Sequence, residues 1–526
     1  MIKGETFDFT IPEDLNLGSF ILDINLEEGR GAKTALYHGD DIYTFDDLWR
    51  LTNRMGNVLR ELGVEPENRV MLVLGDSPAW VAAWIATMKI GGVGTHAYTY
   101  LNTHDYEYLL ELVRPKVTIV DGATLARVRE AMQGRRRRTA LLVAGRVEVE
   151  LGPGEFALEE MLAAASDELD PEPTHCNDLA FWNFSSGTTG KPKGVPHKHR
   201  DGYVSYLSSD RVLQYQADDI VLRVPKLFFH YSRDNLFFSL RKGAASVVFE
   251  ERSSTEGVFD LIAKTKPTVL VNVPSMMRAM IQTPKEQRPD MSSLRRIMSS
   301  GEPLTAQLYQ EWLDDFGIEA VNRFGSAEAT LGYLSNMSGA VMPGSSGKVA
   351  PLVTLRLVDD EGNDVERGEP GILLVHSEAS GIYYEREHEK SLETFPGGGW
   401  VNTGDIFTQD DEDYFWYVSR ADDMLKISGV WVAPMEIERG IQNNPMVNEA
   451  AVLGIDDADG LKRLRAFVVL ANGAAENEET AEALKRYCKE TLAPHKFPTS
   501  IEFLTDLPKT GHGKIDRRFL RENAAP

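Results

Sequence analysis

Short apolar runs alternate with amphipathic segments along the first part of the chain. Arg69–Leu74 reads RVMLVL, and Ala79–Lys89 then repeats apolar positions at helical spacing. Further apolar runs predict strands at Val117–Val120, Ala140–Val143, Ala180–Phe184, Ser246–Phe249 and Thr268–Val273. Continuous apolar strands separated by helical segments are typical of parallel sheets that helices cover on both faces. We therefore predict an α/β fold built on parallel sheets.

The pattern changes twice further along the chain. Glycine, proline and acidic residues become frequent between about 339 and 399, where Gly371–His376 alternates like a strand. We interpret this stretch as a small β-rich region. Beyond Arg420 the pattern predicts three strands, a helix and an extended turn, at Glu449–Ile455, Leu464–Leu470, Ile501–Leu504, Glu478–Thr491 and Pro494–Pro498. This last part predicts a separate small α+β domain.

Composition and charge restrict the class of protein. The chain has 526 residues, of which 42% are hydrophobic, and its length is enough for about three or four domains. Its formal net charge of −24 argues against an extended surface for nucleic acid or anionic lipid, although a local basic cleft for a phosphorylated ligand is compatible with it. Two cysteines, Cys176 and Cys488, cannot make a disulfide scaffold or a four-thiolate metal site.

No segment has the pattern of a membrane span or a signal peptide. The longest apolar stretch, Trp80–Val93, contains Lys89 and is too short for a bilayer. The N-terminal residues MIKGETFDFT lack an apolar core. We therefore expect a cytoplasmic enzyme. The one dense basic cluster, Arg135–Arg138, is either a solvated loop or a contact for a nucleotide or partner.

The segment Ser185–Gly194, which reads SSGTTGKPKG, predicts a phosphate-binding loop behind the strand Ala180–Phe184. Its glycines, Gly187 among them, allow a tight turn that brings N–H groups close to an anion. Lys191 and Lys193 add mobile positive charge. Four hydroxyl groups can donate to phosphate oxygens, from Ser185, Ser186, Thr188 and Thr189. The segment is not a P-loop, because proline follows its Gly-Lys pair.

This loop resembles the signature of the adenylate-forming superfamily, which contains acyl- and aryl-CoA ligases, peptide-synthetase adenylation domains and firefly luciferase. Other family motifs follow in order, and Tyr417–Glu438 resembles benzoate-CoA ligases most closely. The resemblance implies a large adenylating domain at residues 1–421, with two parallel-rich sheets and a small β-rich subdomain. It also implies a small mobile α+β lid at 422–526 with its hinge at Asp422.

The resemblance implies that two segments surround the adenine. Ser299–Pro303 ends a predicted strand and is similar to the family segment that lines the adenine pocket, where Gly301, Glu302 and Pro303 would bind. Asn322–Glu328 is similar to the family's aromatic-Gly-x-Thr-Glu motif. Its nucleotide-binding residues would be Asn322, Arg323, Phe324, Gly325 and Ser326. The flat face of Phe324 would stack on adenine.

The end of this motif implies a magnesium ligand and contains one departure from the family pattern. Glu328 would hold Mg²⁺, a hard cation that prefers oxygen ligands. Ala327 stands where the family usually has threonine, so a hydroxyl that would touch the α-phosphate is missing. Either Thr188 or a water replaces that contact, or the first half-reaction is slower.

Three further family positions concern the ribose and the hinge. Asp405, in the segment WVNTGD, is similar to the acid that binds the ribose, because a carboxylate can accept hydrogen bonds from both hydroxyls of a vicinal diol. Arg420 is similar to the second contact, to ribose or phosphate. Asp422 follows as the implied hinge residue.

The C-terminal part carries the residues implied for coenzyme A and for catalysis. Lys426, Ser428 and Gly429 resemble the side facing coenzyme A, where a glycine would let the pantetheine arm pass close to the backbone. Lys514, in PKTGHGKIDR, resembles the family's catalytic lysine. It would bridge the carboxylate and the α-phosphate as negative charge builds up between them. The resemblance gives catalytic roles to Lys514, Lys193 and Glu328.

An acyl pocket is implied by the segment FFHYSRDN at 228–235 and by three other walls. Its candidate residues are Phe229, His230, Tyr231, Arg233, Val273, Ser300, Gly325 and Leu331. These aromatic residues favour a flat, mostly apolar acid such as benzoate or a related cyclic acid. His230 either gates the carboxylate or is simply buried and hydrogen-bonded. Arg233 either pairs with Asp234 or meets a polar ring substituent or second carboxylate.

The resemblance as a whole implies an ATP-dependent aryl- or acyl-CoA ligase. A carboxylate would attack the α-phosphate of Mg·ATP to give acyl-AMP and pyrophosphate, and coenzyme A would then form the thioester and release AMP. The alternatives are an adenylating enzyme that loads a carrier-protein pantetheine, a medium-chain fatty-acyl-CoA ligase, and a non-catalytic nucleotide-binding protein. We expect small-molecule substrates only, without nucleic acid or membrane, and a monomer or homodimer.

Overall fold

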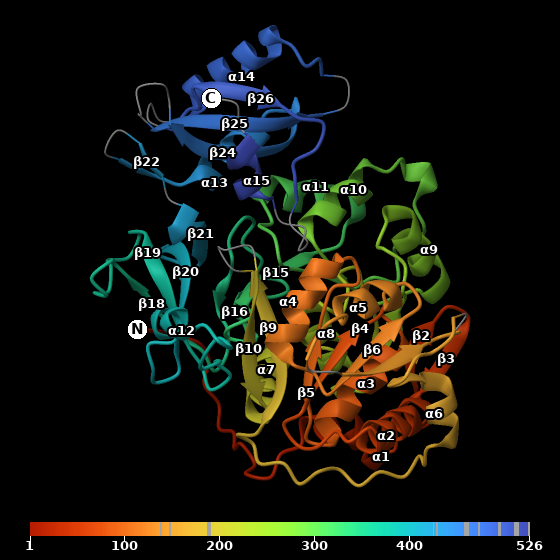
Figure 1. Cartoon of the computed structure of the whole chain (residues 1–526). Coiled ribbons are helices and arrows are strands. Elements are labelled where there is room, and N and C mark those ends of the chain that lie inside the picture. Colours follow the sequence, from red (N-terminus) through yellow and green to blue (C-terminus); the bar gives the residue numbers. More distant parts are fainter. Residues whose placement is uncertain are drawn as a thin grey trace. The chain divides into compact units, whose positions relative to one another are not determined.

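The computed structural model describes residues 1–136, 139–146, 149–186, 191–423, 425–427, 430–456, 462–471, 474–492, 496–509 and 515–523 (Figure 1). The chain forms two compact units. The first comprises Met1–Arg356, Leu374–Thr403 and Glu412–Phe415, and the second comprises Leu357–Leu373, Gly404–Asp411 and Trp416–Pro526. The division at 421/422 and the hinge at Asp422 stay predictions.

A seven-stranded sheet in the first unit has the order β10-β9-β5-β4-β6-β7-β8. Its strands are β4 Arg69–Val73, β5 Val93–His96, β6 Val117–Asp121, β7 Ala140–Ala144, β8 Glu155–Ala157, β9 Leu179–Ser186 and β10 Pro192–Lys198. All neighbours are parallel except β9 and β10, which form an antiparallel hairpin. The strands predicted from apolar runs therefore occur at the expected places.

The second sheet of this unit has nine strands in the order β17-β16-β15-β14-β13-β11-β12-β2-β3. They are β2 Thr34–His38, β3 Asp41–Thr44, β11 Ile220–Arg223, β12 Ala245–Val248, β13 Val269–Asn272, β14 Arg296–Ser299, β15 Ala320–Ser326, β16 Leu331–Ser335 and β17 Lys348–Val349. The inner strands from β2 to β15 are parallel, and antiparallel strands close both edges. The predicted α/β class with two parallel-rich sheets is thus confirmed.

Twelve α-helices accompany these sheets in the described part of the first unit. They are α1 Leu17–Glu27, α2 Phe45–Glu61, α3 Pro78–Lys89, α4 Thr103–Val113, α5 Leu125–Ala131, α6 Leu158–Ala164, α7 His199–Leu213, α8 His230–Arg241, α9 Thr255–Thr265, α10 Pro274–Gln282, α11 Ala306–Phe316 and α12 His388–Thr394. Helices α1, α2, α3 and α8 share one core with residues of β2, β4 and β12. A second core joins α9, α10 and α11 to the nine-stranded sheet.

Local sequence explains where α3 begins and why a lysine is tolerated in it. The hydroxyl of Ser77 accepts a hydrogen bond from the backbone N–H of Trp80, and Pro78 occupies the first helical turn. Lys89 is 1% exposed, and its ammonium donates to the carboxylate of Asp23 at 2.7 Å and to Asn53 at 2.8 Å. A buried charge of this kind requires such partners.

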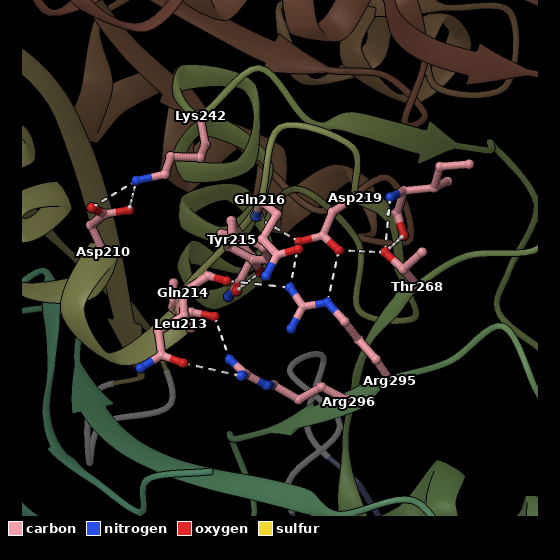
Figure 2. A network of polar contacts seen from close by, with 12 residues as sticks. Asp210, Leu213, Gln214, Tyr215, Gln216, Asp219, Lys242, Thr268, Arg295 and Arg296 are labelled. Carbon is pink, nitrogen blue, oxygen red and sulfur yellow. Dashed lines mark hydrogen bonds and ion pairs between the residues drawn. The ribbon is translucent and has the colours of Figure 1, made fainter.

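The loop after α7 is fastened to the nine-stranded sheet by a polar network (Figure 2). Asp219 accepts hydrogen bonds from Arg295 Nε at 2.9 Å, from the Thr268 hydroxyl at 2.6 Å and from the Gln216 backbone at 2.7 Å. Burial alone would raise the pKa of Asp219, but the hydrogen bonds from Arg295 and Thr268 hold it below its ordinary value. Asp219 therefore stays ionised and binds the loop to the strand starts.

The remaining strands belong to smaller sheets. A five-stranded sheet consists of β1 Ile2–Lys3, β18 Thr354–Val358, β19 Gly371–His376, β20 Trp400–Gln409 and β21 Phe415–Arg420, and of these β18 and β19 lie in the predicted β-rich region. The second unit also contains a hairpin and a three-stranded sheet, β22 Leu425–Ile427, β23 Val430–Val432, β24 Val447–Asp456, β25 Lys462–Leu470 and β26 Ser500–Phe503. Its helices are α13 Pro434–Gln442, α14 Glu478–Thr491 and α15 Arg517–Asn523. The predicted α+β character of this part is confirmed.

None of the described helices has the length and apolar character needed to cross a bilayer.

Candidate active site

The β9–β10 hairpin presents the ends of the predicted phosphate loop. Ser185 and Lys193 are directly opposite each other across this antiparallel pair, so their side chains lie on one face of the hairpin. Lys193 is 8% exposed, which places a lysine ammonium in a largely buried position. Ser186 is the last residue of β9. The predicted contacts Gly187, Thr188 and Thr189 lie outside the described residues.

Tyr384 brings Glu328 together with the two hairpin residues. Its hydroxyl donates to Glu328 Oε1 at 2.6 Å, and it also hydrogen-bonds with the side chains of Ser185 and Thr394. The Lys193 ammonium lies 5.1 Å from the centre of the Tyr384 ring. Burial, followed by the neighbouring charge of Glu328, raises the pKa of Tyr384. The structure thus gathers Ser185, Lys193 and Glu328 around a tyrosine that sequence reasoning missed.

The magnesium assignment of Glu328 can be tested against this donor set. Glu328 offers a carboxylate, the hard oxygen ligand that Mg²⁺ prefers. Within the described ranges, no group of three or more histidine, cysteine, aspartate or glutamate side chains is arranged to hold a metal ion. Such a set fits Mg²⁺ that takes most of its ligands from phosphate oxygens and water, as this ion usually does beside nucleotides.

The segment after β14 bends at Gly301, as its glycine suggests. Gly301 adopts φ +86°, a region that favours glycine. The carboxylate of Glu302 accepts hydrogen bonds from the backbone N–H of Ser275 at 2.8 Å and from its hydroxyl at 2.9 Å, so it caps the start of α10. Ser300 is buried, and Pro303 follows. Binding of adenine by this segment stays a prediction.

Within β15, two side chains of the predicted nucleotide motif bond to the protein itself. Asn322 donates to the Ser345 carbonyl at 3.3 Å, and Arg323 donates to the Ser209 hydroxyl at 3.2 Å. Burial lowers the pKa of Arg323 from its ordinary value. A nucleotide contact through these two side chains stays a prediction.

Three other residues of the motif make local packing and backbone contacts. The ring of Phe324 lies 5.9 Å from that of Tyr333, and Ser326 accepts a hydrogen bond from the backbone of Ala329 at 3.4 Å. A Cβ at Gly325 would lie 2.5 Å from the Leu331 carbonyl oxygen, so only glycine fits this close approach. The motif therefore requires glycine where β15 and β16 meet.

Ala327 contributes a backbone carbonyl to a buried polar set. That carbonyl accepts hydrogen bonds from His197 Nε2 at 2.8 Å and from the Asn183 amide at 3.3 Å. The Asn183 amide also donates to the Thr330 hydroxyl at 2.8 Å. His197 and Asn183 thus hold the loop that carries Glu328, and no sequence motif pointed to either of them.

The predicted acyl segment surrounds the start of α8. Phe229 precedes the helix, and its ring and that of Phe228 pack against Tyr98 with centroids 5.4 and 4.2 Å away. His230 is the first helical residue. Tyr231 has a buried hydroxyl without a hydrogen-bond partner among the described residues, and burial raises its pKa well above the ordinary value. Val273 precedes α10, and Leu331 is buried at the start of β16.

Arg233 does not pair with Asp234, so that part of the sequence interpretation is wrong. Its guanidinium is 1% exposed, lies 4.3 Å from the Trp84 ring centre, and donates to His96 Nδ1 at 3.1 Å and to Asn183 Oδ1. Helix geometry explains the difference, because neighbouring residues on a helix point in different directions. The guanidinium is instead held by α3, β5 and β9.

Asp234 and Arg233 border a cavity of about 30 Å³ that the centres of water molecules can occupy. Its other walls are mostly apolar, from α1, α3, α7 and α8. Burial raises the pKa of Asp234 to about 7, partly offset by the charges of Arg233 and Arg323. A polar ring substituent at Arg233, the other interpretation, stays a hypothesis.

The second unit carries the predicted ribose contacts. Asp405 is 5% exposed, and its Oδ1 accepts from Arg420 Nη1 at 3.2 Å. Gly404, at φ +67°, leaves room for this arginine, because a Cβ there would lie 3.1 Å from Arg420 Nη2. The backbone of Lys426 pairs with Trp431, and Asp422 is exposed. Ser428, Gly429 and Lys514 lie outside the described residues.

We expect Asp405→Ala to raise the dissociation constant for ATP about ten- to a hundredfold. Hydrogen bonds to a charged group contribute about 1.5–3 kcal/mol, and the variant would lose those to the ribose. Isothermal titration with ATP measures the change. The matched control is Asp411→Ala, an exposed acid of the same segment, which should bind ATP like the wild type. Equal ATP affinity for the wild type and Asp405→Ala would contradict the ribose role.

Comparison with known proteins places this geometry in a family. The model of the AMP-binding enzyme family matches residues 25–383, and that of the AMP-binding enzyme C-terminal domain matches residues 436–514. A benzoate–CoA ligase of Thauera aromatica is 36% identical over 515 residues, which cover 97% of this chain and 96% of that protein. The first model includes the phosphate loop and Glu328, whereas Tyr384, Asp405 and Arg420 lie between the two models.

Solved structures agree with this similarity over nearly the full length. An anthranilate CoA ligase in complex with anthranoyl-AMP has a TM-score of 0.91 and 34% identity, covering 98% of each chain. A benzoate CoA ligase from Burkholderia xenovorans LB400 has a TM-score of 0.88 and 34% identity, covering 96% of this chain and 99% of that one. The chain is therefore a member of the AMP-binding, adenylate-forming enzyme family, with benzoate–CoA ligases among its near relatives.

Proposed function

We propose that the chain is an ATP-dependent ligase that joins an aromatic carboxylic acid of the benzoate class to coenzyme A. The observation that carries the proposal is the similarity along the whole chain to a benzoate–CoA ligase and to an anthranilate CoA ligase bound to anthranoyl-AMP. The cluster of Ser185, Lys193 and Glu328 around Tyr384 supports it, because it places a cation and a carboxylate beside the predicted phosphate loop.

In the first half-reaction, a carboxylate oxygen of the acid attacks the α-phosphorus of ATP, and pyrophosphate leaves. The step needs no side-chain nucleophile, since positioning and neutralisation of charge suffice. Lys193 would face the phosphates, and Glu328 would hold Mg²⁺. When bound, Mg²⁺ neutralises phosphate charge. The ammonium of Lys514 would interact with both the attacking carboxylate and the α-phosphate.

In the second half-reaction, the thiolate of coenzyme A attacks the carbonyl carbon of the acyl-adenylate, and AMP leaves. We propose that residues 422–526 act as a lid that turns about Asp422 between the two steps. The lid would present Lys514 for the first step, and the Gly429 side for the second. We place the enzyme in the cytoplasm, as a monomer or homodimer acting on small molecules.

The acid is expected to be flat and to carry an apolar ring. Phe229 and Tyr231 supply aromatic surface at the start of α8, which suits an aromatic ring better than a long flexible chain. Arg323 lies close enough to Tyr231 and to Asp234 to act on the pKa of both, so this end of the helix is polar as well. Hydroxy- and aminobenzoates therefore belong in the test beside benzoate.

The experiment is an acid panel assayed for pyrophosphate release and for thioester formation. It compares benzoate, 2-aminobenzoate, 4-hydroxybenzoate, cyclohexanecarboxylate and octanoate, with and without coenzyme A. We expect pyrophosphate release to depend on an aromatic acid, and the thioester to appear only with coenzyme A.

Each of the other outcomes indicates a different function for this protein. Preference for octanoate indicates a fatty-acyl ligase. Acyl-AMP that reacts only with pantetheine on a carrier protein indicates a loading enzyme. ATP binding without pyrophosphate release from any acid indicates a non-catalytic protein, and would overturn the proposal.

A further inference from the structure

Tyr384 lies between the loop that carries Glu328 and strand β10, which follows the phosphate loop. It is 5% exposed and belongs to the segment that follows β19. The backbone N–H of Gly381 donates to the Glu328 carbonyl at 2.7 Å, and that of Glu385 donates to the Gly194 carbonyl at 2.9 Å. The segment is therefore bound by its backbone both to the loop of Glu328 and to the β10 strand behind the phosphate loop.

The hydroxyl of Tyr384 has a defined direction. A phenol has one proton, and the Tyr384 hydroxyl donates it to the Glu328 carboxylate at 2.6 Å. The side chains of Ser185 and Thr394 also interact with the phenol, and both act to lower the pKa of Tyr384. The phenol therefore links a residue of the predicted phosphate loop to the predicted magnesium ligand.

The ring of Tyr384 has a second contact. The Lys193 ammonium lies 5.1 Å from the ring centre, within the range of a cation–π interaction. The Phe395 ring packs against the Tyr384 ring in an edge arrangement, with centroids 5.2 Å apart, and the backbone N–H of Tyr384 donates to the Ser391 hydroxyl at 2.9 Å. One fixed side chain thus supports the anionic and the cationic residue of the cluster at the same time.

We propose that Tyr384 is a positioning residue that orients the Glu328 carboxylate toward the metal and holds the Lys193 ammonium toward the phosphates of the nucleotide. The inference rests on the proposed function, because it assigns a nucleotide with its metal to this cluster. Carboxylates that bind metals are themselves usually hydrogen-bonded, and loss of such a partner commonly weakens metal binding about ten- to a hundredfold.

Two substitutions distinguish the contact of the Tyr384 hydroxyl with Glu328 from the contact of its ring with Lys193. Tyr384→Phe removes the hydroxyl and keeps the ring, so affinity for Mn²⁺·ATP should fall about ten- to a hundredfold while affinity for ATP in EDTA stays unchanged. Tyr384→Leu also removes the ring, so affinity for ATP in EDTA should fall severalfold as well. Electron paramagnetic resonance of Mn²⁺ measures metal binding, and calorimetry measures ATP binding. In the steady state, Tyr384→Phe should raise KM for Mg·ATP more than it lowers kcat.

The neighbouring tyrosine provides the matched control. Tyr383 is only half-buried, and Tyr383→Phe should leave both affinities unchanged. Glu328→Gln should weaken Mn²⁺ binding, and adding Tyr384→Phe to it should weaken binding little further, because both changes act on one interaction.

Three results would overturn the inference: wild-type Mn²⁺ affinity in Tyr384→Phe, additive effects of the two substitutions, or loss of the native circular dichroism spectrum in Tyr384→Phe. Absence of thioester formation by the wild type would refute the proposed function, yet leave the comparison of Mn²⁺ affinities standing.

Discussion

Lys514→Ala is expected to lower the rate of acyl-adenylate formation about a hundred- to a thousandfold. It should change the reaction of preformed acyl-adenylate with coenzyme A by less than about threefold. The expected loss is that of one well-placed donor to a developing negative charge, here between the attacking carboxylate and the α-phosphate. The second half-reaction does not build up charge between those groups, so the same lysine has little to stabilise there.

The two half-reactions can be measured separately in single turnovers. Acid-dependent pyrophosphate release reports the first, and thioester formation from synthetic benzoyl-AMP reports the second. Lys509→Ala is the matched control, because Lys509 precedes Lys514 in the same segment and is 39% exposed beside Glu449. The control should keep both rates. Equal losses in both half-reactions for Lys514→Ala would rule out the assigned role.

Arg233→Ala is expected to lower the free energy of unfolding by about 3 kcal/mol. The guanidinium is almost fully buried against the Trp84 ring and donates to His96 and Asn183, so its removal takes one donor from each of two buried polar groups and opens a cavity. Asn183 also supports the carbonyl of Ala327, so the disturbance extends to the loop that carries Glu328.

Urea unfolding followed by circular dichroism measures this loss. Arg252→Ala, at an exposed position, should change stability by less than about 0.5 kcal/mol. Arg233→Lys should recover only part of the loss, because lysine keeps the charge but lacks the planar fork that stacks on Trp84. If Arg233→Ala were as stable as the wild type and changed only the choice among substituted benzoates, Arg233 would be a substrate contact instead.

Much of the fold followed from local pattern. The strand predicted at Gly371–His376 and the helix predicted at Glu478–Thr491 have the predicted bounds in the structure. The strand predicted at Thr268–Val273 is one residue shorter at each end in the structure. Thr268 instead bonds to Asp219, and Val273 precedes α10. Such ends depend on caps and side-chain bonds that apolar periodicity does not record.

The pairing of polar side chains was not predictable in the same way. Arg233 and Asp234 are adjacent in sequence and opposite in charge, yet the arginine binds His96 and Asn183, which come from other strands. A buried donor takes whatever acceptor the fold brings within reach, and that choice depends on distant segments.

By itself, the sequence determined the order of strands and helices, the parallel-rich α/β class and the resemblance to adenylate-forming enzymes. These depend on short-range periodicity and on residue types within single segments. Only the tertiary structure decided that Tyr384 contacts both Glu328 and Lys193, and that Arg233 is buried and binds side chains of the protein core. Those contacts join segments far apart in the chain, and hydrogen bonds form between atoms that are close in space, whatever their separation in sequence.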